Sequence, residues 1–202
     1  MSSSTSGESV PGATEAQRRR GRRLALTLLA ICAAPTVAAW LAYFVWPPQS
    51  RINYGDLIEA HPLRDPELRG VDGVPFRLSQ LRGKWVLLQI DSGACAEGCR
   101  RKLLYMRQAR LAQGKDAQRM ERVWLLADSA TPDPGLLRDH DGIRVVRAPG
   151  SLLAEFPAPR SATDHIYVVD PLGNLMLRFP GDPDAQRMTK DLARLLKVSR
   201  VG

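Results

Sequence analysis

The chain has 202 residues, of which 44% are hydrophobic and 25% charged, and its formal net charge is +8. This length allows one ordinary domain with an appendage, and this composition excludes a wholly disordered chain, a collagen-like chain and a membrane protein of many spans. Three cysteines are too few for a disulfide-stapled scaffold, and three histidines are too few for a dense metal cluster.

The excess of positive charge is unevenly distributed and is densest just before a long apolar segment. Five arginines lie within residues 18–23, and residues 24–46 carry no charge. A segment of this length can cross about 30 Å of hydrocarbon, and flanking arginines favour the cytoplasmic side. We expect a disordered, arginine-rich cytoplasmic tail at 1–23 and a transmembrane helix at 24–46. A cleaved signal peptide with its site at residues 37–39 is the alternative, but the apolar run continues past that site.

The rest of the chain is only mildly basic. It has no stripe of basic residues interleaved with aromatic ones, so we expect no nucleic-acid partner. Residues 47–69 begin with two prolines and are interpreted as a linker, which holds His61 as an exposed linker histidine. This leaves residues 70–202 as the folded domain.

Strand and helix signals alternate along this domain. Short apolar runs predict buried strands at 86–90, 123–127 and 143–146. Apolar residues at helical spacing predict helices at 99–113, 132–139 and 184–197, and a helical turn at 151–156. A turn sequence at 170–174 separates two further strands, at 166–169 and 175–179, as in a hairpin. A βαβ unit followed by a ββα unit is the plan of a thioredoxin-like α/β fold, here preceded by a single N-terminal transmembrane helix.

The candidate chemistry lies where the first buried strand ends and the first helix of the domain begins. Cys95 and Cys99 are four residues apart, so they lie one helical turn apart on one face. The amide groups at a helix N-terminus lower the pKa of a thiol, and three basic residues at 100–102 either add to this effect or form a solvated face. A disulfide is geometrically compatible if the first helical turn is loosened. Two buried, unreactive cysteines are the alternative.

The spacing of these cysteines separates two kinds of chemistry. A redox thioredoxin normally has two residues between its cysteines, whereas this chain has three. His165 precedes a late strand, at a place from which a side chain can approach the helix N-terminus. Two thiolates and one imidazole form a soft ligand set suited to copper, as Cu(I) or, with a further ligand, Cu(II). The neighbouring Asp164 is a candidate to orient the imidazole.

These features resemble the Sco/SenC family, which comprises membrane-anchored, thioredoxin-fold proteins that bind copper and help assemble the CuA centre of cytochrome c oxidase. The resemblance covers about residues 78–197 and the N-terminal anchor. It rests on LRGKWVLL at 81–88, Cys-x-x-x-Cys at 95–99, Asp164-His165 and YVVDPLG at 167–173. It implies that Cys95, Cys99 and His165 bind copper. It also implies an oxidase subunit carrying CuA as partner, and a bacterial-type inner membrane with the C-terminal domain in the periplasm.

Two features depart from the family pattern. Ala96 and Arg100 follow the cysteines where the family usually has proline, and the interval from His165 to the tyrosine-containing strand is shorter than usual. A shorter interval makes His165 either a copper ligand or a hydrogen-bonded structural histidine at the strand edge. His140, in the sequence RDHDG, is interpreted as a turn histidine.

Three functions follow from these observations. The first is a copper metallochaperone for the CuA centre, acting through Cys95, Cys99 and His165. The second is an enzyme, a thiol–disulfide oxidoreductase in which Cys95 and Cys99 are catalytic and His165 is dispensable. The third is a non-catalytic docking protein near the membrane, in which neither cysteine is needed.

Overall fold

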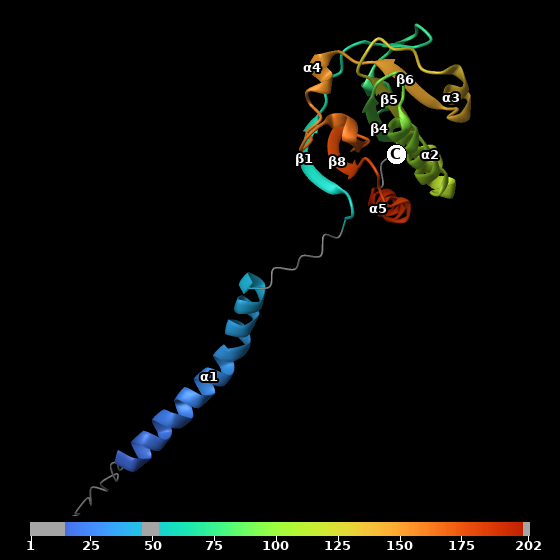
Figure 1. Ribbon diagram of the computed structural model, residues 1–202. Helices are drawn as coiled ribbons and strands as arrows, with labels where there is room; N and C mark the ends of the chain where they lie inside the picture. Colours follow the sequence, from blue (N-terminus) through green and yellow to red (C-terminus); the bar gives the residue numbers. More distant parts are fainter. Residues whose placement is uncertain (1–14, 46–52, 200–202) are drawn as a thin grey trace, which may run out of the picture. The chain divides into compact units, whose positions relative to one another are not determined.

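The computed structural model of the chain describes residues 15–45 and 53–199. It divides the chain into two compact units, Met1–Ser50 and Arg51–Gly202. The first unit contains helix α1 (Glu15–Val45), which continues through Pro35 (Figure 1). Among the described residues, its segment Arg19–Leu41, which includes an 18-residue window of mean hydropathy 2.1, is long and apolar enough to cross a membrane. α1 is therefore a candidate single-pass anchor.

The start of α1 differs from the expected disordered tail. Residues 15–23 are helical, because the arginines there are good helix formers and continue the helix of the apolar segment. Residues 1–14, and Trp46 at the end of the expected membrane helix, lie outside the described part of the chain. Cys32 is an exposed free thiol in α1.

The second unit is built on an eight-stranded sheet with the order β1-β8-β7-β4-β5-β6-β2-β3. β4, β5 and β6 are parallel, and the β7–β8 hairpin joins them with β7 antiparallel to β4. This is the βαβ plus ββα plan, so the predicted thioredoxin-like fold is confirmed. The strands are β1 (Asp56–Pro62), β2 (Leu68–Gly70), β3 (Pro75–Phe76), β4 (Trp85–Asp91), β5 (Met120–Leu126), β6 (Ile143–Arg147), β7 (His165–Val169) and β8 (Asn174–Pro180). The helices are α2 (Glu97–Leu111), α3 (Pro134–Asp139), α4 (Gly150–Leu153) and α5 (Ala185–Val198), with 3-10 turns η1 (Leu78–Leu81), η2 (Gly114–Arg119) and η3 (Ala162–Asp164).

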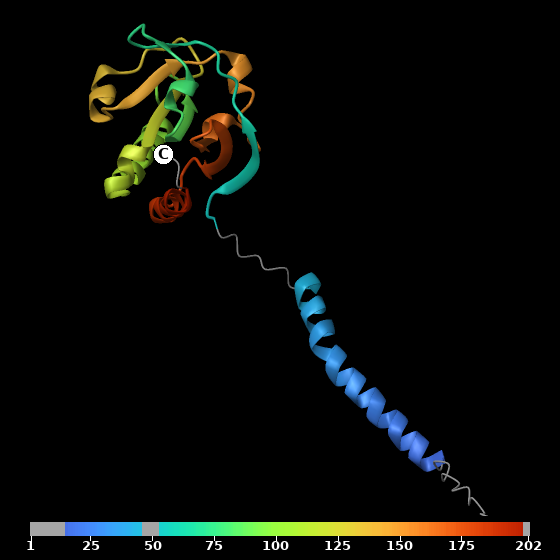
Figure 2. The same ribbon diagram turned by 180° about the vertical axis from the view of Figure 1, so that it is seen from behind.

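Apolar clusters lie on both faces of this sheet, with α2 and α5 on one face and α4 on the other (Figures 1 and 2). Alternate residues of β4 point to opposite faces, as the period of a strand requires. Leu87 packs with side chains of α2 and α5, whereas Leu88 packs with Leu152 of α4 and with the segments around η1. A third cluster extends the α2 face toward α3 and includes both cysteines of the domain. The two cysteines therefore lie between α2, the sheet and α3.

Part of the segment expected to be a linker, at residues 47–69, forms strands. β1 pairs antiparallel with β8, and β2 pairs with β6 and β3. These strands lie toward the two edges of the sheet, where one side is solvated, so their sequences lack the apolar runs that mark the central strands. His61 lies in β1 rather than in an exposed linker, and its ring nitrogens contact the carbonyl oxygens of Glu59 and Glu155 at 2.9 and 3.2 Å.

Candidate functional site

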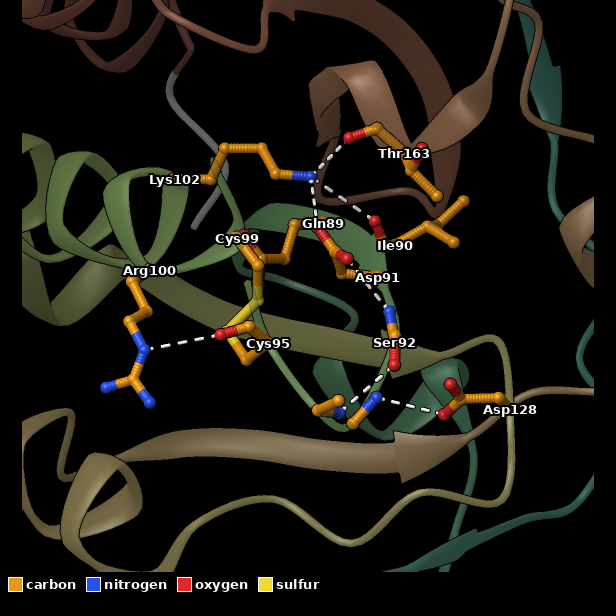
Figure 3. Close-up of a disulfide and its surroundings, with 12 residues drawn as sticks. Gln89, Ile90, Asp91, Ser92, Cys95, Cys99, Arg100, Lys102, Asp128 and Thr163 are labelled. Carbon is orange, nitrogen blue, oxygen red and sulfur yellow. Dashed lines mark hydrogen bonds and ion pairs between the residues drawn. A yellow bond between two sulfur atoms is a disulfide. The ribbon is translucent and has the colours of Figure 1, made fainter. Parts of the chain in front are cut away.

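Cys95 and Cys99 form a disulfide at the carboxyl end of β4, with their Cα atoms 5.1 Å apart (Figure 3). Each cysteine is only 2% exposed. Cys99 lies in the first turn of α2, whereas Cys95 precedes the helix and has a φ of 43°. This left-handed conformation, rare for a residue with a side chain, turns Cys95 back toward Cys99. The helical turn between the cysteines is thus loosened, as a disulfide at this spacing requires.

The loop before Cys95 is fixed by hydrogen bonds from its own backbone. The Gly93 N–H donates to Asp128 Oδ1 at 2.9 Å, and the Cys95 N–H donates to the Ser92 carbonyl at 3.1 Å. The pKa of Asp128 is lowered, first by the hydrogen bond from the Ser92 side chain and then by the one from the Gly93 N–H. A Cβ atom on Gly93 would lie 2.1 Å from the Ala130 carbonyl oxygen, so this loop requires glycine here.

A buried amide contacts one sulfur of the pair. Gln89, on the face of β4 that points toward α2, is fully buried. Its Nε2 donates to Cys99 Sγ at 3.5 Å, within reach of the weak hydrogen bonds that sulfur accepts. The two sulfur atoms therefore differ in their surroundings, because Cys99 has a polar donor beneath it. This asymmetry is suited to two cysteines with distinct roles.

Lys102 is buried beside the disulfide, so of the two alternatives given for the basic residues at 100–102, the solvated face does not apply to it. Its side chain is 3% exposed, and its Nζ forms an ion pair with Asp91 Oδ2 at 2.8 Å. The same Nζ donates to the Ile90 carbonyl at 3.3 Å and to the Thr163 carbonyl. An ammonium group has three N–H donors, so each has an acceptor. Lys102 thus joins α2, the end of β4 and turn η3 (Figure 3).

The residues on the solvent side of the disulfide are small or charged. Ala94, Ala96 and Gly98 are exposed, as is Glu97 in the first turn of α2. Arg100 is exposed, and its Nε donates to the Cys95 carbonyl at 3.3 Å. The exposed residues that flank the two cysteines are therefore small, apart from Glu97 and Arg100, whose charges are opposite in sign.

His165 is the first residue of β7 and is half-buried. Its Nδ1 lies 3.1 Å from the Phe179 carbonyl oxygen, which can only accept, so Nδ1 carries the proton and Nε2 keeps its lone pair. Its ring packs edge-on against Tyr167, with 6.0 Å between the ring centroids. Burial raises the pKa of Tyr167 to about 12, so the phenol is neutral at physiological pH. His165 is thus hydrogen-bonded at the strand edge, and one nitrogen can still bind a metal.

The three implied copper ligands are not grouped as a metal site in this structure. Within the described residues, no three side chains of His, Cys, Asp or Glu lie together so that they could hold a metal ion. The structure joins Cys95 to Cys99 and anchors His165 to β8. The donor types suit copper only after the disulfide is reduced, because thiolates are the ligands. His140 lies at the end of α3, in the expected turn, but it is 7% exposed.

Three residues around the site were not predicted from the sequence as site residues: Gln89, Lys102 and Asp128. Gln89 is the one polar residue in an otherwise apolar strand pattern, and this is the signal that could have identified it. Lys102 falls on the helical stripe of Cys99 and Met106, so its periodicity indicates burial despite its charge. Asp128 follows β5, and the cysteines follow β4. Because these two strands are parallel, their carboxyl ends lie at the same edge of the sheet, which could have placed Asp128 near the cysteines.

Solved structures share this fold. Yeast Sco1 with copper bound has a TM-score of 0.59 and 13% identity, over 70% of this chain and 96% of that one. Apo Sco1 from Thermus thermophilus has a TM-score of 0.55 and 22% identity, over 72% and 95%. The thioredoxin domain of a thiol-disulfide oxidoreductase from Bacteroides vulgatus has a TM-score of 0.52 and 16% identity, over 70% and 99%. These similarities support the thioredoxin-like fold of the chain.

Comparison with curated protein sequences finds no match. The model of one protein family matches residues 85–199, which include β4 through α5 and both cysteines of the site. That family is described as a transmembrane-like, thioredoxin-like, C-terminal domain. Because the match covers more than half of the sequence, the chain belongs to this family of transmembrane-like proteins with a thioredoxin-like C-terminal domain.

Proposed function

We propose that this chain is a membrane-anchored thiol–disulfide oxidoreductase whose working group is the Cys95–Cys99 pair. The observation that carries the proposal is the disulfide between the end of β4 and the first turn of α2. A helix N-terminus favours a thiolate, so the reduced pair is a good nucleophile and a good leaving group.

The exchange has two balanced steps. A thiolate of Cys95 attacks one sulfur of a substrate disulfide, forms a mixed disulfide and releases the first substrate thiolate. The Cys99 thiolate then attacks Cys95 Sγ, forms the Cys95–Cys99 disulfide and releases the second substrate thiolate. The released thiolates take up the protons that the two cysteines gave up. We assign the resolving step to Cys99, because it lies in α2 above Gln89, whereas Cys95 precedes the helix.

The test is a redox titration of the full chain in nonionic detergent against dithiothreitol, with Cys95→Ser and Cys99→Ser as controls. A potential above about −300 mV, with rapid exchange toward a small neutral disulfide, is expected of a working pair. Cys99→Ser should accumulate the mixed disulfide, and Cys95→Ser should react slowly. A potential below about −300 mV without measurable exchange would make the disulfide a structural one and refute the proposal.

Copper delivery is a second candidate function. It is favoured by the chemistry of the donors, two sulfurs and the free Nε2 of His165, and by the fold shared with copper-bound Sco1. In this function copper is the cargo of the reduced site, and the partner is an oxidase subunit with a CuA centre. The solved structures that share this fold also include a thiol-disulfide oxidoreductase, so the fold agrees with both candidate functions.

Copper binding by the reduced full chain, measured by competition with a Cu(I) chelator, separates the two candidates. One-to-one binding that is lost in Cys95→Ser and weakened at least about tenfold in His165→Ala is expected of a Cys-Cys-His site. Binding that is indifferent to His165 would remove this ligand set. Thiol–disulfide exchange that persists in His165→Ala would favour the oxidoreductase. Assembly of cytochrome c oxidase that persists when both cysteines are replaced by serine would favour a docking protein.

Both functions are proposed for the periplasmic side of a bacterial-type inner membrane. The arginines at the start of α1 favour a cytoplasmic N-terminus, and the domain follows the span. Protease added to spheroplasts is expected to remove the domain and to spare α1. Protection of the domain from this protease would reverse the orientation.

A further inference from the structure

One face of α2 carries an alternating row of arginines and leucines that begins at the disulfide. Arg100, Leu104, Arg107 and Leu111 follow one another at spacings of four, three and four residues, so they lie on one side of the helix. All four are exposed, with Leu104 at 42% and Leu111 at 58%. We call these four residues the α2 stripe. The buried side of the same helix holds Cys99 and Met106.

The α2 stripe is cationic and is not neutralised by carboxylates of the domain. Among the described residues, neither Arg100 nor Arg107 forms an ion pair with a carboxylate, and the neighbouring Arg101 has only Asp182 at 4.0 Å. The single acidic residue of α2 is Glu97, in its first turn. Lys102 shows the contrast, because its charge is buried and paired on the other side of the helix (Figure 3). The charge of the stripe is thus available to a partner.

The stripe is continuous with the reactive pair. Arg100, its first member, donates to the carbonyl of Cys95, so the guanidinium lies at the edge of the disulfide (Figure 3). A polypeptide that brings a sulfur atom to Cys95 therefore has α2 beside it. Exposed leucines between arginines favour a segment with apolar side chains between acidic ones, because each leucine then leaves water while each guanidinium finds a carboxylate.

We infer that the α2 stripe is the docking face for an acidic, leucine-rich segment of the protein whose disulfide the Cys95–Cys99 pair exchanges. This inference rests on the proposed oxidoreductase function and names the chemistry of its substrate. Opposite charge steers the encounter and raises the association rate, and the leucines hold the segment in place. A salt-dependent preference for acidic substrates follows.

The test uses the reduced full chain in nonionic detergent and three peptides of equal length. Each peptide carries one cysteine as a mixed disulfide with 2-thiopyridine, and leucines alternate with Asp, Asn or Lys. Release of the neutral thiopyridine chromophore measures the rate of exchange. We expect the acidic peptide to react about tenfold faster than the neutral one at low salt, and this ratio to fall several-fold at 1 M salt.

Variants of the stripe test its role directly. Arg107→Glu is expected to abolish the preference for the acidic peptide, while the rate with a small neutral disulfide stays the same. Arg69→Glu places the same charge change on an exposed residue of β2 and is the matched control, with the order unchanged. Leu104→Ser with Leu111→Ser is expected to slow the acidic and neutral peptides to a similar extent.

The outcomes separate the two proposals. Equal rates for the three peptides, with normal exchange of the small disulfide, would overturn the docking face and leave the oxidoreductase. Binding of the acidic peptide without its disulfide, measured by fluorescence anisotropy and abolished in the arginine variant, would support the docking face even if no exchange occurred. A preference that disappears in anionic but not in neutral nanodiscs would assign the stripe to a lipid surface and overturn the inference.

Discussion

Replacement of Asp91 by alanine tests whether the ion pair between Lys102 of α2 and Asp91 of β4 is a main source of the stability of the domain. The side chain of Lys102 is 3% exposed, and that of Asp91 is 18% exposed. Loss of the carboxylate leaves a buried ammonium with two carbonyl acceptors and no anion. Breaking a buried pair from one side typically costs about 3–5 kcal/mol. Because Asp91 is partly exposed, water can reach the vacated position, and we expect the lower end, about 3 kcal/mol.

Urea unfolding of the full chain in nonionic detergent, followed by tryptophan fluorescence, measures this cost. With a slope of about 2 kcal/mol per M, the midpoint of Asp91→Ala should fall by about 1.5 M. Glu67→Ala removes a carboxylate from an exposed pair with Arg77, at 3.6 Å, and should cost less than about 1 kcal/mol. Asp91→Ala combined with Lys102→Met removes both charges and should recover much of the loss. A midpoint change below about 0.5 M for Asp91→Ala would refute the reasoning.

Two further predictions concern the loop before Cys95. Gly93→Ala should destabilise the domain by about 1–3 kcal/mol, because the added Cβ meets the carbonyl of Ala130, whereas Gly98→Ala meets nothing within 4 Å and should stabilise α2; urea midpoints of both variants check this. Asp128→Asn should lower the melting temperature at pH 7, and the gap between variant and wild type should become smaller as the pH falls to 3. The lowered pKa of Asp128 means that its contribution is present above the unfolded pKa of about 4 and is lost as the pH falls through the folded pKa. A difference that is the same at both pH values would contradict this.

The central elements of the fold were predictable because burial on both faces leaves a clear sequence pattern. β4 and β5 read as apolar runs, and α5 repeats Met188, Leu192 and Leu196 at helical spacing. The outer strands were not predictable in the same way. β1 has the sequence DLIEAHP and lies at one edge of the sheet, so its pairing with β8 depends on a long-range contact that no local pattern records.

For the candidate site, the position of the two cysteines between strand and helix was predictable, whereas the residues that surround them were not. Cys95 and Cys99 were predicted from their position between a buried strand and a helix, and the disulfide joins them. The role of Lys102 depends on contacts of α2 with the end of β4, at Ile90 and Asp91, and with turn η3, at Thr163, and these segments meet only in the folded chain. Its burial was visible from the helical period, but its charge favoured the opposite interpretation. That His165 is a copper ligand stays a prediction.

The two departures from the Sco/SenC pattern have different physical consequences. Ala96 has φ −62° and ψ 175°, angles that proline also adopts, so alanine in place of proline at this position does not require a different backbone conformation. The Arg100 N–H donates to the Ala96 carbonyl at 3.1 Å, a bond that proline cannot make. Arginine at this position therefore closes the first turn of α2 and also places a guanidinium against the carbonyl of Cys95. The change at the residue after Cys99 therefore adds both a backbone hydrogen bond and a positive charge beside the disulfide.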